Sequence, residues 1–312
     1  MRNSYAKPCI FVLAGAARAV QKILRGSFKK KAFMHIAISS SKDVISKIKA
    51  ITMQFSSLFT NLALERPRIF PANVVAGVTL RNKDSFAGAG FSPLKAQIFT
   101  EEEAERHRAY LAQNLGARRE ALIFQRQTHG TLVRRVFASD CGMEGYSFAP
   151  FDESDGIATG DAGVIVCAGI ADCAAILLYD ARNHAVAAVH SGWKGTRDNI
   201  VRRALCQMGT WFGSRATEVL AYVSPCASGE RYRVREDVAQ YFSPPALRQI
   251  TSEEYAFDNR ARIREQLLAE GVAAEHLEIA EGCTIADERY HSHRRDGAQA
   301  GRMVTFIGVN AP

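Results

Sequence analysis

The sequence has no pair of cysteines at the C-x-x-C spacing, although it contains seven cysteines in 312 residues. They are odd in number and scattered, at positions 9, 141, 167, 173, 206, 226 and 283. Disulfide scaffolds carry even sets of cysteines, and structural zinc sites carry closely paired ones. The spacing therefore argues against both. It favours a reducing compartment, with Cys173 as a candidate functional thiol.

Long apolar runs and internal repeats are also missing. No run approaches the ~18–20 apolar residues of a membrane-spanning helix, so we expect no membrane partner and a cytoplasmic location. Hydrophobic residues make up 47% of the chain and charged residues 23%, which is typical of a globular protein with one sizeable core.

Acidic residues are almost absent from the first 52 positions. This segment carries eleven Lys and Arg and one acid, Asp43, whereas the remaining 260 residues carry 29 basic and 31 acidic side chains. The net charge of +8 therefore belongs to the leader and not to the body of the chain. A nucleic-acid-binding domain normally has a basic face, so we expect no nucleic-acid partner.

The basic segment 1–52 allows three interpretations. The scarcity of acids is typical of a mitochondrial transit peptide, which would change the location. A short apolar stretch over 9–17 followed by Ala-Arg-Ala is compatible with a secretory signal. The third interpretation, which we favour, is a poorly ordered leader or an over-extended start, with Met53 as the alternative beginning. We divide the chain into this leader, 1–52, and a catalytic domain, 53–312.

Apolar patterning over 70–312 mixes strands with helices. It predicts helices over 101–115, 199–212 and 258–271. It predicts strands over 73–80, 121–127, 164–170, 174–179, 185–189, 219–223, 277–280 and 303–309. We expect a single α/β domain with a mixed sheet flanked by helices.

Three reactive side chains come directly after predicted strands: His129, Cys173 and His190. Strand ends can bring distant positions together, so gaps of 44 and 17 residues are no obstacle. Two imidazoles and a thiolate suit Zn²⁺ and leave a fourth position open. The spacing alone also allows Cys173 as a nucleophile with His190 as its base, or ordinary packing of all three.

Glycines and arginines provide candidate anion sites. Gly192, Gly195 and Thr196 predict a tight turn entering a helix from about residue 197, whose free N–H groups attract anions, or which simply cap the helix. Trp193 could stack on a flat ring or pack as a rim aromatic.

The C-terminal Arg294 and Arg295 suit bidentate anion binding or a salt-bridged loop. Arg81, after the first predicted strand, is a further possible contact. His291 and His293 could form a second metal site, although a surface pair is the simpler interpretation.

Two acids lie near the reactive set. Asp172 should point away from Cys173 in an extended backbone, which suits a loop-fixing role. Asp155 could be a general base, but Ser-Asp-Gly is turn chemistry and favours a turn residue.

These segments together resemble the YfiH family, also called the laccase-domain or multicopper polyphenol oxidoreductase-like family, which includes a peptidoglycan editing factor. The resemblance covers about 70–310 and follows the family's order. Its segments are Gln-Thr-His-Gly at 127–130, Ser-Asp-Gly at 154–156, Ala-Asp-Cys at 171–173, His-Ser-Gly-Trp-Lys-Gly-Thr at 190–196, Ser-Gly-Glu-Arg-Tyr-Arg-Val at 228–234, Cys-Thr at 283–284, Ser-His-Arg-Arg-Asp-Gly at 292–297 and Gly-Arg at 301–302.

The resemblance implies a fold shared with cysteine–histidine toxin deamidases, and one zinc held by His129, Cys173 and His190. It implies phosphorolysis of adenosine, inosine, guanosine and methylthioadenosine, and hydrolytic deamination of adenosine. The partners would be purine nucleosides and phosphate, bound by a monomer or weak homodimer. Cys173, His190 and Asp172 are then the catalytic candidates. Candidates for binding substrate or phosphate are Arg81, Trp193, Gly195, Thr196, Arg294 and Arg295.

The chain departs from the family pattern in the segment 79–85, which lacks the usual glycine pair, and at His293, where a tyrosine is usual. Copper is less suitable than zinc, since we find no ligand set for several coppers. Two rival functions stay open. One is a Cys173–His190 hydrolase that edits a peptidoglycan precursor, and the other is a non-catalytic binding protein that uses its basic leader.

Overall fold

The strands fall into two six-stranded mixed sheets. The computed structural model describes residues 62–310 except 87 and 143–147. The first sheet has the order β1 (Leu64–Glu65), β2 (Val74–Thr79), β15 (Met303–Val309), β7 (Ile165–Ile170), β3 (Leu122–Arg126) and β5 (Phe148–Glu153). Its pairs are antiparallel from β1 to β7 and parallel from β7 to β5.

The second sheet has the order β14 (Leu277–Ile279), β10 (Val219–Val223), β8 (Ala174–Asp180), β9 (Ala185–Ser191), β6 (Gly156–Thr159) and β4 (Val133–Arg135). Its outermost pairs are parallel and its inner pairs antiparallel. A small third sheet consists of β11 (Arg233–Val234), β13 (Tyr255–Phe257) and β12 (Leu247–Gln249).

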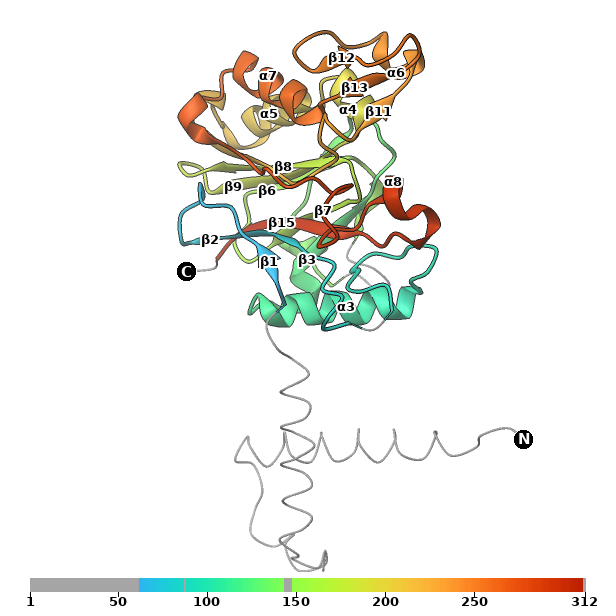
Figure 1. Ribbon diagram of the computed structural model, residues 1–312. Helices are drawn as coiled ribbons and strands as arrows, with labels where there is room; N and C mark the ends of the chain where they lie inside the picture. Colours follow the sequence, from blue (N-terminus) through green and yellow to red (C-terminus); the bar gives the residue numbers. More distant parts are fainter. Residues whose placement is uncertain (1–61, 87, 143–147, 311–312) are drawn as a thin grey trace, which may run out of the picture. The chain divides into compact units, whose positions relative to one another are not determined.

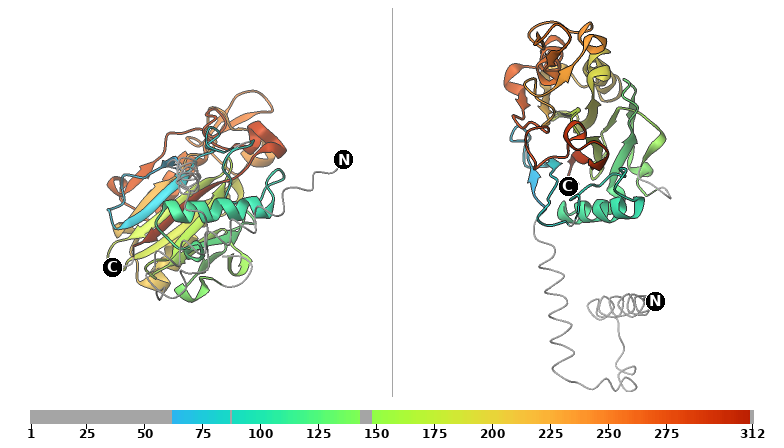
Figure 2. Two further views of the ribbon diagram at one scale, coloured as in Figure 1. Left: turned by 90° about the horizontal axis from the view of Figure 1, so that it is seen from below. Right: turned by 45° about the vertical axis from the view of Figure 1, so that its right-hand side comes forward.

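The two large sheets lie face to face, and helices cover their outer faces (Figures 1 and 2). Leu177 and Ala188 of the second sheet pack with Val166 and Ile307 of the first in the central core. Helix α3 (Glu101–Asn114) covers the first sheet, and α5 (Ile200–Phe212) and α7 (Asn259–Ala269) cover the second. Because β7, β8, β9 and β15 are buried along their whole length, they appear in the sequence as continuous apolar runs instead of alternating ones.

Local signals set the helix ends. The side chain of Thr100 caps α3 in a reciprocal arrangement with Glu103, which is a capping box. Asn199 caps α5, and Gly213 ends it in the left-handed conformation. Asp258 caps α7. The predicted helices and strands are present, with ends that differ by one or two residues.

The expected α/β class with mixed strand directions is confirmed, but the strands form two large sheets where one was expected. The short strands β1, β4, β6 and β11 to β13 were missed, because two to four residues are too few to establish a period. The short helices α4 (Trp193–Arg197), α6 (Glu236–Ala239) and α8 (His293–Asp296) were missed for the same reason. The six-residue β5 was missed as well. The predicted domain boundary at residue 52 lies outside the described residues. In the described part of the chain, no helix has the length and apolar character to cross a membrane.

Candidate metal centre

His129, Cys173 and His190 converge where the two large sheets meet. His129 follows β3 of the first sheet, Cys173 lies in the crossing from β7 to β8, and His190 is near the end of β9. One nitrogen or sulfur atom from each lies within 4.8 Å of the others. The juxtaposition expected from strand ends is therefore observed, although His129 follows a strand of the first sheet and His190 lies in the second.

The Asp155 carboxylate organises this cluster. It is fully buried in the bend between β5 and β6. Its oxygens accept hydrogen bonds from the backbone N–H groups of Thr128, His129 and Gly130, at 3.2, 3.0 and 2.7 Å. It also accepts one from Nδ1 of His190 at 2.8 Å. Backbone position alone suggested a turn residue, but the side chain joins the His129 loop to His190.

Three consecutive backbone N–H groups can all donate to one carboxylate only if the backbone adopts an unusual conformation. His129 has φ 60°, the left-handed region that is uncommon for residues other than glycine. The bonds to Asp155 hold this conformation and direct the His129 ring to the His190 ring, with centroids 4.9 Å apart and planes at 88°.

The charges of Cys173, His190 and Asp155 shift the pKa values of the cluster in the direction that suits cation binding. Burial by itself raises the pKa of Cys173, but the charge of His190 and hydrogen bonds from both histidines outweigh it, so this pKa lies below its usual range. Burial lowers the pKa of His190, and the Cys173 thiolate and Asp155 outweigh that effect and raise it. The pair favours a thiolate, which is the form that binds metals.

Gly192 makes room for the three side chains. A Cβ at this position would lie 3.0 Å from Cδ2 of His129 and 3.1 Å from Sγ of Cys173. Both distances are shorter than ordinary carbon contacts, so a glycine is needed where β9 runs into α4.

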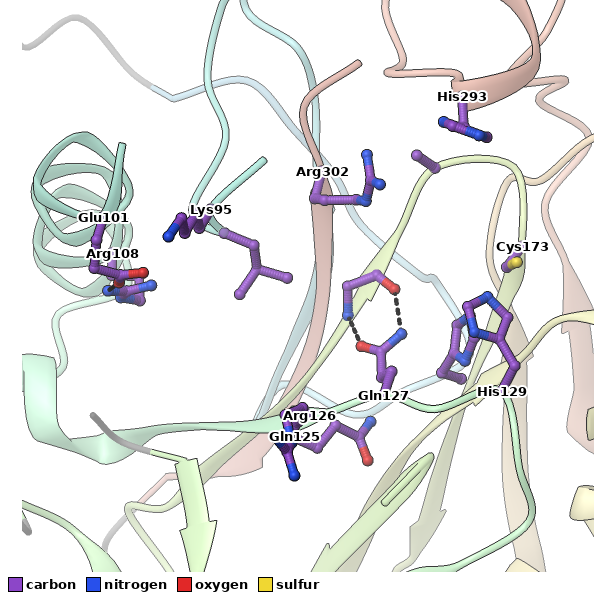
Figure 3. Close-up of a pocket in the computed structure, with 14 residues that line it drawn as sticks. Lys95, Glu101, Arg108, Gln125, Arg126, Gln127, His129, Cys173, His293 and Arg302 are labelled. Atoms are coloured by element: carbon purple, nitrogen blue, oxygen red, sulfur yellow. Dashed lines mark hydrogen bonds and ion pairs between the residues drawn. The ribbon is translucent and has the colours of Figure 1, made fainter. Parts of the chain in front are cut away.

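A cavity of about 520 Å³ opens from the cluster. Figure 3 shows His129 and Cys173 at one end, and Lys95, Glu101 and Arg108 toward the other. In the middle, the Gln127 amide exchanges two hydrogen bonds with the backbone of Gly169, at 2.8 and 2.7 Å. Gln127 thus ties the end of β3 to β7.

Sequence reasoning missed much of the cavity lining. Gln125 and Lys95, which were not predicted, line the cavity. So do Arg302, which had entered only as part of a Gly-Arg motif, and His293, which had entered only as a possible ligand of a second metal site. The motif was the one available signal, because loop residues far apart in the sequence show no period. The cavity residues come from α3 and the loop before it, from β3, β7 and the turns after them, from β9 and α8, and from the segment leading into β15.

The six candidates for substrate or phosphate contact are absent from this lining. Trp193 and Arg294 line a neighbouring cavity of about 440 Å³, where Trp193 stacks on Tyr241 and Arg294 lies over Tyr232. Trp193 is therefore a wall of a different cavity.

Arg81 and Arg295 use their guanidinium groups in structural contacts. Arg81 is 9% exposed and binds the Ala89 carbonyl and Asp296. Arg295 also pairs with Asp296, and its other donors reach backbone carbonyls of the loop before α8. The salt-bridged loop, and not an anion clamp, is the arrangement observed.

Gly195 and Thr196 lie inside α4, which begins at Trp193 and not near residue 197 as predicted. The Thr196 N–H donates to the Gly192 carbonyl, and its hydroxyl shares a hydrogen bond with Ser191. Both residues are buried, so their N–H and O–H groups serve the helix and its packing.

Asp172 also has a structural position. Its carboxylate accepts hydrogen bonds from the Thr284 hydroxyl and the Arg294 N–H, both at 2.6 Å. Asp172 has φ 86°, so the extended backbone assumed in predicting its orientation is not present, but these hydrogen bonds agree with the loop-fixing role.

His291 and His293 do not form a surface pair. His291 is fully buried, with its nitrogens bonded to the backbone of Phe91 and Gly301. His293 is exposed and lines the cavity, so the two rings serve different environments.

The model of the family described as multi-copper polyphenol oxidoreductase laccase matches residues 100–310. The chain belongs to this family, and the predicted resemblance to the YfiH family is confirmed. Within the described residues, one group of three His, Cys or acidic side chains could hold a metal ion, and this group is the His129–Cys173–His190 cluster.

Relatives of this chain carry the name purine nucleoside phosphorylase. The purine nucleoside phosphorylase YlmD of Bacillus subtilis is 28% identical over 247 residues, which cover 76% of this chain and 88% of that protein. A purine nucleoside phosphorylase of Deinococcus radiodurans is 34% identical over 210 residues, covering 65% and 76%. The crystal structure of YlmD from Geobacillus stearothermophilus has a TM-score of 0.72 and 28% identity, covering 78% and 94%. That of Bacillus licheniformis YfiH, at 0.70 and 24%, covers 76% and 93% and shows the same fold.

Proposed function

We propose that the protein is a metal-dependent purine nucleoside phosphorylase, with zinc at His129, Cys173 and His190. The observation that carries the proposal is a three-ligand cluster at the end of a cavity large enough for a nucleoside. Relatives named as purine nucleoside phosphorylases supply the substrate class.

The donor set fits one zinc ion. Two imidazoles and a thiolate are borderline-soft ligands, and three ligands leave a fourth position for substrate or water. Asp155 accepts from Nδ1 of His190, which keeps the proton there and leaves Nε2 for the metal. When bound, the ion would supply Lewis acidity at the cavity end.

The chain's own groups orient the substrate and handle the proton. The Gln127–Gly169 pair keeps the cavity wall rigid. His293 lines the cavity near Cys173 (Figure 3) and is the imidazole placed to protonate the departing purine. Asp155 works through His190 and the His129 loop, so it is a positioning residue.

We assign the individual substrates and the second reaction to this same metal centre. We include adenosine, inosine, guanosine and methylthioadenosine as phosphorolysis substrates. Hydrolytic deamination of adenosine is the second reaction, for which a bound metal ion would supply an activated water.

A nucleoside panel with and without phosphate tests the proposal, with metal analysis on the same purified sample. We expect about one zinc per chain and release of free purine that requires phosphate. Inosine formation from adenosine without phosphate would report deamination. Metal-free protein with full turnover would contradict the proposal.

The rival functions give different results. A Cys173 hydrolase would survive chelation and lose activity on thiol alkylation. A docking protein would lose binding when residues 1–52 are deleted, whereas the phosphorylase keeps its turnover.

A further inference from the structure

The cavity contains more positive charge than its acids balance. Four basic side chains line it: Lys95, Arg108, Arg126 and Arg302. Arg108 pairs with Glu101 and Glu105, and Arg126 pairs with Glu153. In the described part of the chain, neither Lys95 nor Arg302 makes an ion pair with a carboxylate.

Arg302 is held in place but not neutralised. Its Nη1 donates to the carbonyls of Ala300 and Gly301 at 3.1 and 2.9 Å, so these bonds orient the group through one nitrogen. The side chain is half-buried, and burial lowers its pKa. The negative charges of Cys173 and Asp172 oppose this lowering only in part. A partly buried cation with no paired carboxylate is costly, and a bound anion reduces that cost.

The same cavity has a second unsatisfied polar group, on the other side of Gln127 from Arg302 (Figure 3). Gln125 is 4% exposed and lines the same cavity. Its Oε1 accepts from the Ser154 hydroxyl at 3.3 Å, but among the described residues its buried Nε2 has no hydrogen-bond partner. An unpaired buried donor is destabilising unless a ligand oxygen accepts from it.

We propose that Arg302, with Lys95 at the rim of the cavity, forms the subsite for a phosphoryl group of the substrates. This inference rests on the proposed phosphorylase function. Figure 3 shows Arg302 between Lys95 and the end that holds Cys173. A purine at the metal end therefore leaves its sugar facing this cationic middle of the cavity.

The chemistry needs an anion there. In phosphorolysis, a phosphate oxygen donates an electron pair to form a bond with the anomeric carbon of the ribose. The bond from that carbon to the purine nitrogen breaks, its electron pair goes to the purine, and the purine takes up a proton. Arg302 would hold the attacking phosphate. The same subsite could accept the 5′-phosphate of a nucleotide, which presents the same chemical group.

The test compares metal-loaded wild type with Arg302→Gln, Lys95→Gln and, as a control outside the cavity, Arg215→Gln, whose charge Glu218 balances. Two readouts are used: the KM for inorganic phosphate and for inosine, and the rise in melting temperature that phosphate or adenosine 5′-monophosphate causes. We expect Arg302→Gln to raise the phosphate KM roughly tenfold to a hundredfold, with the inosine KM changed less than about threefold. Lys95→Gln should give a smaller rise, and Arg215→Gln about none.

Melting temperatures without ligand show whether each variant folds. Because Lys95 is exposed, its variant keeps the test valid if Arg302→Gln does not fold. Loss of the phosphate-induced shift in these variants supports inorganic phosphate as the occupant. If only the melting-temperature shift caused by adenosine 5′-monophosphate is lost, the result supports a substrate's own phosphoryl group as the occupant. Unchanged responses to both ligands in folded Arg302→Gln and Lys95→Gln overturn the subsite. If wild type turns over no nucleoside but binds phosphate through Arg302, the proposed function fails and the subsite stands.

Discussion

Nδ1 of His190 donates a 2.8 Å hydrogen bond to Asp155, whose carboxylate also holds the backbone of the His129 loop. One buried acid thus sets two of the three candidate metal ligands, which lie in different sheets. Carboxylate–histidine pairs of this kind fix the orientation of a ligating ring and raise its basicity.

Asp155→Asn should weaken zinc affinity by roughly 10- to 100-fold. The asparagine amide keeps one acceptor oxygen, so it cannot accept from both the loop and His190. Competition with a chelator of known affinity measures the change. Asp180→Asn replaces another buried carboxylate, at the end of β8, and should keep zinc affinity. Equal affinities in the two variants would argue against a positioning role for Asp155.

Metal-free protein should alkylate at Cys173 with an apparent pKa of about 6. The thiolate is the reactive form, so the rate should be full at neutral pH and fall as the pH drops through that value. Peptide-resolved mass spectrometry with iodoacetamide follows it. Buried Cys167, whose pKa burial raises, should stay unmodified, and zinc should protect Cys173. A titration at the usual thiol value near 9 would show that the coupling to His190 is absent.

Gly192→Ala should lower zinc affinity by roughly tenfold while the protein stays folded. The added methyl would press on His129 and Cys173 at 3.0 and 3.1 Å, which displaces two ligands. Gly130→Ala is the matched control, because its Cβ would meet Asp155 and Thr128 at 3.6 Å, an ordinary contact. Zinc titration of both variants checks this, and a Gly192→Ala protein with full affinity would contradict it.

His293→Asn should lower kcat for phosphorolysis by about 10²- to 10⁴-fold, the range for removal of a general acid. Zinc content should not change, because His293 is outside the ligand cluster. A melting temperature equal to that of wild type would separate the effect on chemistry from an effect on folding. An unchanged kcat would assign the proton to solvent or another group.

Leu177→Ala should destabilise the protein by about 2–5 kcal/mol. Leu177 is fully buried in the core between the two large sheets, so its loss leaves a cavity. Urea unfolding measures the change. Leu132→Ala removes a side chain that is 49% exposed and should cost less than about 1 kcal/mol. Substrate KM should be the same in both, because neither residue lines the cavity.

The sequence by itself determined the long elements and the three ligand candidates. Apolar runs such as 303–309 and capped helices such as α3 depend on local patterning, and strand ends are where His129, Cys173 and His190 meet. The division into two sheets was decided by packing, because a fully buried strand looks the same in either sheet.

The tertiary structure alone decided the second half of the site. Asp155 resembles a turn residue in sequence, and only burial beside His190 gives its carboxylate a function. Arg294 and Arg295 look like anion ligands, but the Arg233 carbonyl accepts from Arg294, and Asp296 and carbonyls of the preceding loop accept from Arg295. Arg302 is left without a balancing acid. Charge balance depends on which side chains meet in space, and contacts between loops have no period for the sequence to display.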